Sequence, residues 1–200
     1  MNHMVQKRDS LELEIINQLV KSNNHVRGLA KILQESHSTI SRILKKLTKE
    51  NVVDFKQEGK NKKFFLKESP LTKSYILKGE LHKLSTLLKN YPTMNIIIED
   101  ILNKTNEKLI ILFGSYAKFN AKKGSDIDIY IETKDRKVKK QVEEINSKIN
   151  VKIGPFDKKS PLIKEIIEDH IIIRGLEDFY ERKKNKLNLT EVKHNDKRSN

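Results

Sequence analysis

The sequence lacks cysteine and has no long apolar run. Without cysteine the chain can form neither disulfides nor thiolate-bound zinc sites, which is typical of a reducing compartment. No apolar stretch reaches the roughly 18 residues of a membrane-spanning helix, and the N-terminal segment lacks the apolar core of a signal peptide. The six histidines are scattered without ligand spacing, which argues against a histidine metal site. We therefore expect a soluble, cytoplasmic protein with no membrane partner.

Negative charge is also scarce. The 27 Asp and Glu face 41 Lys and Arg, which gives a net charge of +14 and a pI near 9.7. This imbalance favours a polyanionic partner, most simply nucleic acid. The alternative is that the abundance of Lys, Asn and Ile reflects a biased genome.

The composition changes near residue 70, and 200 residues suffice for two small domains. We predict a first domain over 9–68, a linking helix over 69–91 and a second domain over 92–180. The remaining residues, 181–200, are basic and nearly free of apolar side chains, so we expect a disordered tail that adds nonspecific DNA affinity.

The first domain has helical periodicity followed by two strands. Apolar residues recur at helical spacing from Asp9 or Ser10 onward, then again from Val26, and a third helix is predicted from a cap at Ser36 to Ser38 up to about Glu50. Residues 1–8 are polar and lie outside this pattern. VVDFKQEGKNKKFFLK then predicts a β-hairpin with a basic tip.

Three short helices and a basic hairpin resemble the winged helix-turn-helix of bacterial and archaeal transcription regulators. The resemblance implies that the third helix enters the major groove and that the hairpin contacts phosphates. Residues 1–69 hold 14 Lys and Arg against 8 Asp and Glu, which supports a DNA partner over protein contacts alone. The side chains expected to bind DNA are Ser38, Thr39, Arg42, Lys45, Lys46, Lys60, Lys62 and Lys63.

The linking helix begins at Pro70 and carries leucines at 77, 81, 84 and 88. This heptad spacing is compatible with a homodimer through residues 70–90, but two heptads also fit packing against the chain's own domains.

The pattern of residues 112–132 predicts a buried strand, a Gly-Ser turn, a polar crossover and a second strand. The sequence of this stretch is LFGSYAKFNAKKGSDIDIYIE. Alternation places Asp126 and Asp128 on one strand face, about 7 Å apart, and the isoleucines between them on the other. Two carboxylates so close repel each other unless a cation lies between them, and Mg²⁺ is the natural one. The turn at Gly114 and Ser115 offers outward-facing amides and a hydroxyl to phosphates.

Gly114-Ser115, ten residues and then Asp126-Ile127-Asp128 resemble the motif of minimal nucleotidyltransferases in the DNA polymerase β superfamily. The resemblance covers roughly Pro92 to Phe179. It implies that Gly114 and Ser115 bind a nucleoside triphosphate, while Asp126 and Asp128 are the catalytic residues and hold Mg²⁺. An ordinary acidic edge strand after a tight turn is the alternative.

The family's third carboxylate comes from a later strand, which we predict over Ile149 to Phe156. Alignment places Lys152 at the acidic position, and Asp157 could replace it only in a shifted register. An ammonium there would weaken metal binding by an amount on the order of several kcal/mol. Whether the domain is an active enzyme is therefore left open.

The whole pattern predicts an α+β chain: a winged helix-turn-helix, a linking helix and a mixed sheet with helices packed on it. The first functional reading is a DNA-binding transcription regulator whose nucleotidyltransferase-like domain binds nucleotide, with weak or lost catalysis. The alternatives are an active enzyme that modifies a protein or small-molecule hydroxyl, and an antitoxin-type partner of a toxin.

Overall fold

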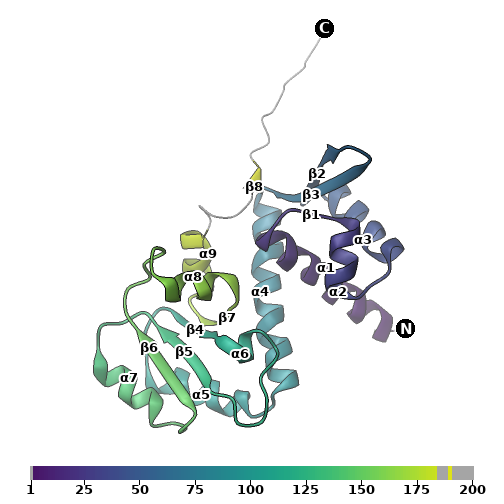
Figure 1. Ribbon diagram of the computed structural model, residues 1–200. Helices are drawn as coiled ribbons and strands as arrows, with labels where there is room; N and C mark the ends of the chain where they lie inside the picture. Colours follow the sequence, from purple (N-terminus) through teal and green to yellow (C-terminus); the bar gives the residue numbers. More distant parts are fainter. Residues whose placement is uncertain (1, 184–188, 191–200) are drawn as a thin grey trace. The chain divides into compact units, whose positions relative to one another are not determined.

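The computed structural model describes residues 2–183 and 189–190, with side chains from residue 10 to residue 183. Its contacts divide the chain into two compact units, Met1–Gly79 with Lys186–Asn200 and Glu80–Asn185 (Figure 1). Most of the predicted tail lies outside the described residues. Within the described part, no helix is long and apolar enough to cross a membrane.

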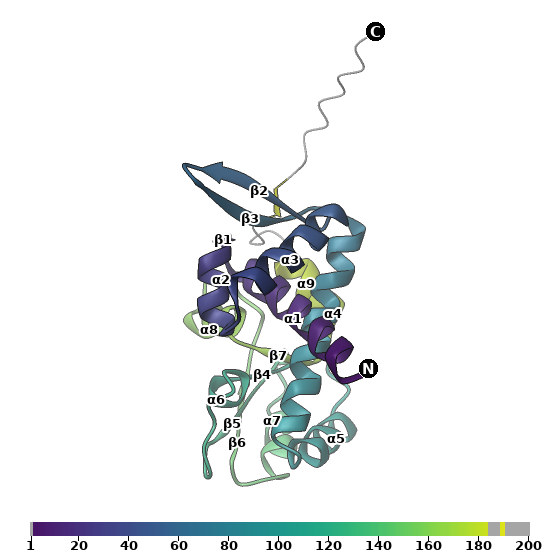
Figure 2. The ribbon, with the colours of Figure 1, turned by 90° about the vertical axis from the view of Figure 1, so that its right-hand side faces the viewer.

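The first unit combines helices with a small sheet. Figure 2 shows its hairpin standing out from the three N-terminal helices. The sheet order is β1-β3-β2, all antiparallel, and β8 adds a short parallel pair on β3. The elements are α1 (Asn2–Lys21), β1 (Asn24–His25), α2 (Val26–Leu33), α3 (His37–Lys49), β2 (Val53–Glu58), β3 (Asn61–Lys67), the first half of α4 (Pro70–Asn90) and β8 (Leu189–Thr190).

The predicted third helix is confirmed as α3. Ser36 is its N-cap, and its hydroxyl accepts a hydrogen bond of 3.1 Å from the Thr39 amide. The helix buries an apolar stripe of Ile40, Ile43, Leu44 and Leu47, and therefore turns its other face to solvent. Helix α1 begins at Asn2 rather than near residue 9, because no proline or glycine interrupts the polar residues ahead of the apolar stripe.

The second unit contains the predicted mixed sheet, in the order β6-β5-β4-β7. Strands β5 and β6 run parallel, whereas β4 is antiparallel to both β5 and β7. The elements are the second half of α4, α5 (Met94–Lys104), β4 (Ile110–Phe113), α6 (Gly114–Ala117), β5 (Ile127–Ile131), α7 (Arg136–Glu143), β6 (Ile149–Ile153), α8 (Pro161–Glu168), β7 (Ile171–Arg174) and α9 (Leu176–Lys183).

Apolar clusters cover both faces of this sheet. Ile127, Ile129 and Ile131 pack with residues of α4, α5 and α7, as the alternation predicted. On the opposite face Tyr130 joins residues of α8 together with Phe179 of α9. Helix α9 continues to Lys183, three residues into the predicted tail. The end of β5 that carries Asp128 is thus held on a rigid, two-sided support.

Part of the leucine seam of helix α4 packs into the core of the second unit. Leu84 and Leu88 pack against the cluster that contains Leu87, whereas Leu81 is 54% exposed. The structure therefore gives two of the four heptad leucines an intramolecular role, and the homodimer stays a prediction.

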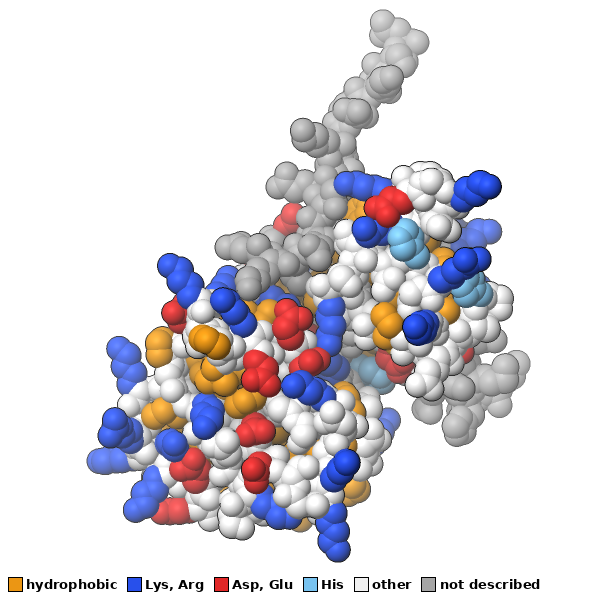
Figure 3. Space-filling model, in the orientation of Figure 1, with side chains coloured by type: hydrophobic (Ala, Val, Ile, Leu, Met, Phe, Trp, Pro, Cys, Tyr) orange, Lys and Arg blue, Asp and Glu red, His pale blue; other side chains and the backbone are white. Residues whose placement is uncertain are grey.

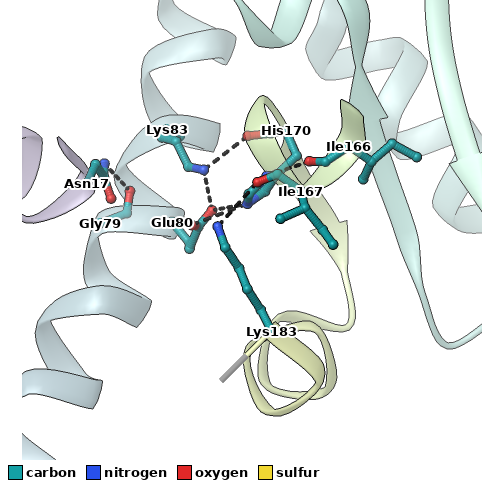
Figure 4. Close-up of polar contacts among 8 residues, drawn as sticks. All are labelled: Asn17, Gly79, Glu80, Lys83, Ile166, Ile167, His170 and Lys183. Atoms are coloured by element: carbon teal, nitrogen blue, oxygen red, sulfur yellow. Dashed lines mark hydrogen bonds and ion pairs between the residues drawn. The ribbon is translucent and has the colours of Figure 1, made fainter. Parts of the chain in front are cut away.

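A buried polar cluster also connects the second half of α4 to the rest of the second unit (Figure 4). The Lys83 ammonium lies 2.5 Å from the Glu80 carboxylate and donates to the His170 carbonyl at 3.0 Å. The His170 ring hydrogen-bonds the Ile166 carbonyl through Nδ1 at 2.8 Å and turns Nε2 toward Glu80 at 3.3 Å. Burial raises the pKa of Glu80, but the neighbouring Lys83 and His170 outweigh it and hold this pKa below its usual range. Burial and the Lys83 charge lower the pKa of His170 to about 4.

Candidate functional site

The first candidate site lies where β4 ends and the Gly-Ser turn begins. Phe113, the last residue of β4, pairs with Asp128 of β5. The next residue, Gly114, has φ +71°, a backbone conformation that favours glycine. A Cβ at Gly114 would also overlap the Asp128 carboxylate. Glycine therefore serves both the turn and the close approach of the carboxylate to the backbone.

The other motif residues lie at the same end of the sheet. Ser115 is half-buried in α6, the single turn that follows Gly114. Asp126 is exposed and immediately precedes β5, and Asp128 is half-buried within that strand. Acidic side chains gather in the middle of the visible face of this unit in Figure 3. The Gly-Ser turn and the carboxylate strand are therefore neighbours, as the motif requires.

That Lys152 occupies the family's third acidic position stays a prediction, and the strand pairing shows which residues lie beside the carboxylates. In the register of β5 and β6, Asp128 pairs with Asn150, whereas Lys152 pairs with Tyr130. Asn150 Nδ2 donates a 2.9 Å hydrogen bond to Asp128 Oδ1. A shift of two residues keeps a strand side chain on the same face, so the sequence alternation could not separate the two positions.

Asp157 does not complete the site either. It is exposed in a turn beyond β6, where its carboxylate accepts a 2.9 Å hydrogen bond from the Lys159 amide. Glu132, which follows β5, is likewise committed elsewhere. Its carboxylate accepts from Arg182 at 2.7 Å and from the Phe156 amide at 3.1 Å.

The donor set fits magnesium better than a metal held entirely by protein. Among the described residues no group of three His, Cys, Asp or Glu side chains is arranged to hold a metal ion. Asp126 and Asp128 are two carboxylates, with the Asn150 side chain bonded to the second of them. Mg²⁺ is commonly bound through one or two carboxylates together with substrate phosphates and waters. Asp126 and Asp128 therefore match in number the carboxylates that a protein commonly contributes to such a site.

A second candidate site is a groove in the first unit between α3, the start of α2 and the hairpin β2–β3. Phe55 and Phe64 form part of its wall, and the Lys62 ammonium lies 3.9 Å from the centre of the Phe55 ring. Lys and Arg side chains stand out on the visible face of this unit in Figure 3. None of the described residues that line the groove is acidic, and its cationic side chains are Arg27, Arg42, Lys45, Lys46, Lys49, Lys60 and Lys62.

Five of the predicted DNA-binding residues line the groove, namely Arg42, Lys45, Lys46, Lys60 and Lys62. Ser38 and Thr39 do not line it, and their hydroxyls lie 2.9 and 2.8 Å from the Ser36 hydroxyl at the helix cap. Two lysines pair with carboxylates: Lys46 with Glu12 at 2.6 Å and Lys63 with Glu58 at 3.3 Å.

Several groove residues were not among those predicted to bind DNA. Arg27 comes from the start of α2, and His37, Ser41 and Lys49 come from α3. His37, Ser41 and Lys45 follow each other at intervals of four, so they share a helix face with Lys49. That spacing was the available signal. The position of Arg27 depends on how α2 packs, which the sequence did not specify.

Two comparisons agree with this division of the chain. Residues 9–54 match the family model described as bacterial regulatory protein, arsR family, and residues 94–174 match that of the nucleotidyltransferase domain. A search of curated proteins found no match. The chain thus carries a helix-turn-helix region of the ArsR type followed by a nucleotidyltransferase domain, in the predicted α+β architecture.

Proposed function

We propose that this chain, which joins an ArsR-type helix-turn-helix region to a nucleotidyltransferase domain, is a DNA-binding transcription regulator. Its second unit binds a nucleoside triphosphate. The observation that carries the nucleotide half is the position of Gly114 directly against Asp128. This arrangement puts a turn backbone and a carboxylate side by side, where one ligand can contact both.

Each residue of the nucleotide site has a defined task in this proposal. Gly114 and Ser115 supply the backbone amide and hydroxyl donors for phosphate oxygens. Asp126 and Asp128 hold magnesium, which supplies neutralisation of the phosphate charge when it is bound. Asn150 donates to Asp128 Oδ1 and so fixes the orientation of that carboxylate.

Asn150 also favours weak or lost catalysis over an active nucleotidyltransferase. An amide neither accepts a proton at neutral pH nor adds negative charge to a metal site. The proposed site therefore combines the Gly-Ser turn and two carboxylates with an amide, which cannot replace the third carboxylate that the resemblance leads one to expect. We therefore expect nucleotide binding with little transfer.

An active magnesium-dependent nucleotidyltransferase is the second candidate. It is favoured by the retention of both carboxylates beside the Gly-Ser turn. In that case catalysis consists of positioning and charge neutralisation, and the acceptor is a hydroxyl of a protein or small molecule.

In the DNA half of the proposal, α3 lies in the major groove. Ser41 and Arg42 face base edges, and an arginine there can donate two hydrogen bonds to a guanine. Arg27, Lys45, Lys49, Lys60 and Lys62 contact phosphates on the two sides of the groove. Lys46 and Lys63 contribute less, because carboxylates already neutralise part of their charge.

Calorimetry with ATP, GTP, CTP and UTP, with and without magnesium, tests the nucleotide half. We expect at least one triphosphate to bind in a magnesium-dependent manner, and the Asp126→Asn and Asp128→Asn variants to lose that dependence. Incubation with labelled nucleotide separates the two candidates, since transfer of label supports the enzyme. Failure of all four triphosphates to bind would refute both.

A further inference from the structure

An exposed aromatic side chain lies between the Gly-Ser turn and the carboxylate strand. Phe119 has φ +54°, a left-handed conformation that is uncommon for a bulky residue. Its side chain is 37% exposed and belongs to neither apolar cluster of the second unit. The ring contacts found among the described residues do not include it. Core packing therefore does not account for an aromatic residue at this position.

Backbone hydrogen bonds fix Phe119 close to the proposed phosphate-binding turn. The Lys118 amide donates to the Gly114 carbonyl at 3.2 Å, and the Asn120 amide donates to the Ser115 carbonyl at 3.1 Å. The Phe119 amide itself donates to the Tyr116 carbonyl at 3.1 Å. The aromatic residue is thus held one turn away from Gly114 and Ser115.

The other end of the same segment is fixed beside the carboxylates. The Ser125 amide donates to the Lys122 carbonyl at 3.0 Å, and the Lys122 amide donates to Ser125 Oγ at 2.9 Å. Asp126 follows directly. Residues 118–125 therefore start at the phosphate-binding turn and end at the metal-binding carboxylates.

The charge of this segment matches a nucleotide. It contains three lysines and no acidic residue. Lys118 lies 3.4 Å from Glu165, whereas Lys122 and Lys123 are exposed, with no carboxylate partner among the described residues. An exposed ring next to unpaired cations is the combination that binds bases by stacking and phosphates by charge.

We propose that Phe119 is the platform on which the base of the bound triphosphate stacks, and that Lys122 and Lys123 add attraction for its phosphates. This inference rests on the proposed function of the second unit. It makes Phe119 a binding residue and assigns a task to a segment that the Gly-Ser and carboxylate motif leaves unspecified. A triphosphate without a base cannot use the ring.

The test compares magnesium-ATP with magnesium-tripolyphosphate by calorimetry on the full chain. We expect Phe119→Leu to weaken ATP binding by roughly five- to 150-fold, the range for loss of one stacked base. Tripolyphosphate affinity should stay unchanged, and Phe119→Tyr should bind ATP as the parent does.

Two results would overturn the stacking role while leaving the nucleotide site intact. One is an unchanged ATP affinity in Phe119→Leu. The other is an equal loss of ATP and tripolyphosphate, which would indicate a general distortion of the site. A parent chain that binds neither ligand would instead refute the proposed nucleotide function, and the stacking role with it.

Discussion

Two features exclude a side chain at Gly114, the backbone conformation and the space occupied by Asp128. Its φ of +71° strains any L-residue, and the Asp128 carboxylate occupies the space of a Cβ. We expect Gly114→Ala to lower the free energy of unfolding by about 2–4 kcal/mol and to abolish nucleotide binding. Gly124→Ala is the matched control, because Gly124 has φ +99° with open space around it. Its cost should be about 1 kcal/mol in urea denaturation, and equal costs would show that Asp128 does not crowd Gly114.

Asn150 offers the sharpest change at a single residue. Asn150→Asp places a carboxylate opposite Asp128, where the two charges repel until a metal binds between them. We expect at least about a tenfold gain in magnesium affinity with nucleotide present, and a lower melting temperature without magnesium. Lys152→Asp is the control, since Lys152 pairs with Tyr130 and should give little gain. A larger gain from Lys152→Asp would contradict the register of β5 and β6.

Some of the candidate site residues could be predicted from the sequence, and others could not. Gly114, Ser115, Asp126 and Asp128 followed from motif spacing alone, because strand, turn and strand are local features. Asn150 did not, because its role depends on how β6 aligns with β5 across 22 residues. Alternation fixes the face of a strand side chain, whereas the partner strand fixes its neighbour.

At the scale of elements, α3 and the hairpin were readable from helical and strand periodicity and from the Ser36 cap. The groove between them was not, since it also takes Arg27 from α2.

We expect Lys62→Ala to weaken binding to all duplexes and to lower the dependence of log affinity on log salt by about 0.9, the value for one phosphate contact. Lys31→Ala, an exposed lysine outside the groove, should leave the slope unchanged. Equal slopes for both variants in fluorescence anisotropy would exclude Lys62 from the interface.

The buried cluster of Glu80, Lys83 and His170 predicts a pH dependence of stability. Because the pKa of His170 falls to about 4 on folding, the unfolded chain takes up a proton below its pKa of 6.5 that the folded chain does not. Stability is therefore full above pH 6.5 and declines as pH falls toward 4, by at most about 1.4 kcal/mol per pH unit. The lowered pKa of Glu80 adds a further decline only below about pH 4.5.

Urea denaturation between pH 7 and pH 4.5 checks this dependence. His170→Gln should be less stable at pH 7 but should lose less stability on acidification than the parent. Ile32→Ala, which changes an exposed side chain without a titratable group, should keep the parental slope. A parental slope in His170→Gln would show that His170 is not the group responsible.

Across the whole molecule, the change of composition near residue 70 predicts a boundary there, whereas the contacts divide the chain within α4, between Gly79 and Glu80. The length of that helix was predictable, but the residues that tie it to each unit were not. In the first unit Asn17 donates to the Gly79 carbonyl at 3.2 Å, and in the second Glu80 and Lys83 reach His170 (Figure 4). These polar contacts join residues 62 to 90 positions apart in sequence, which periodicity does not reveal.

The net charge of +14 by itself explains attraction to any polyanion, including both DNA and triphosphates. In the proposed function the two ligands instead bind separate sites in one chain. Specific binding must therefore be separable by substitutions that leave the other ligand untouched.

The most direct test is to measure on the full chain the affinities for a specific DNA duplex and for magnesium-nucleotide, in the parent and in two variants. We predict that Arg42→Ala weakens specific DNA binding by about 1–3 kcal/mol with nucleotide affinity unchanged. Asp128→Asn should abolish magnesium-dependent nucleotide binding with DNA affinity unchanged. Loss of both ligands in either variant, or a parent that binds only one of them, would contradict the account.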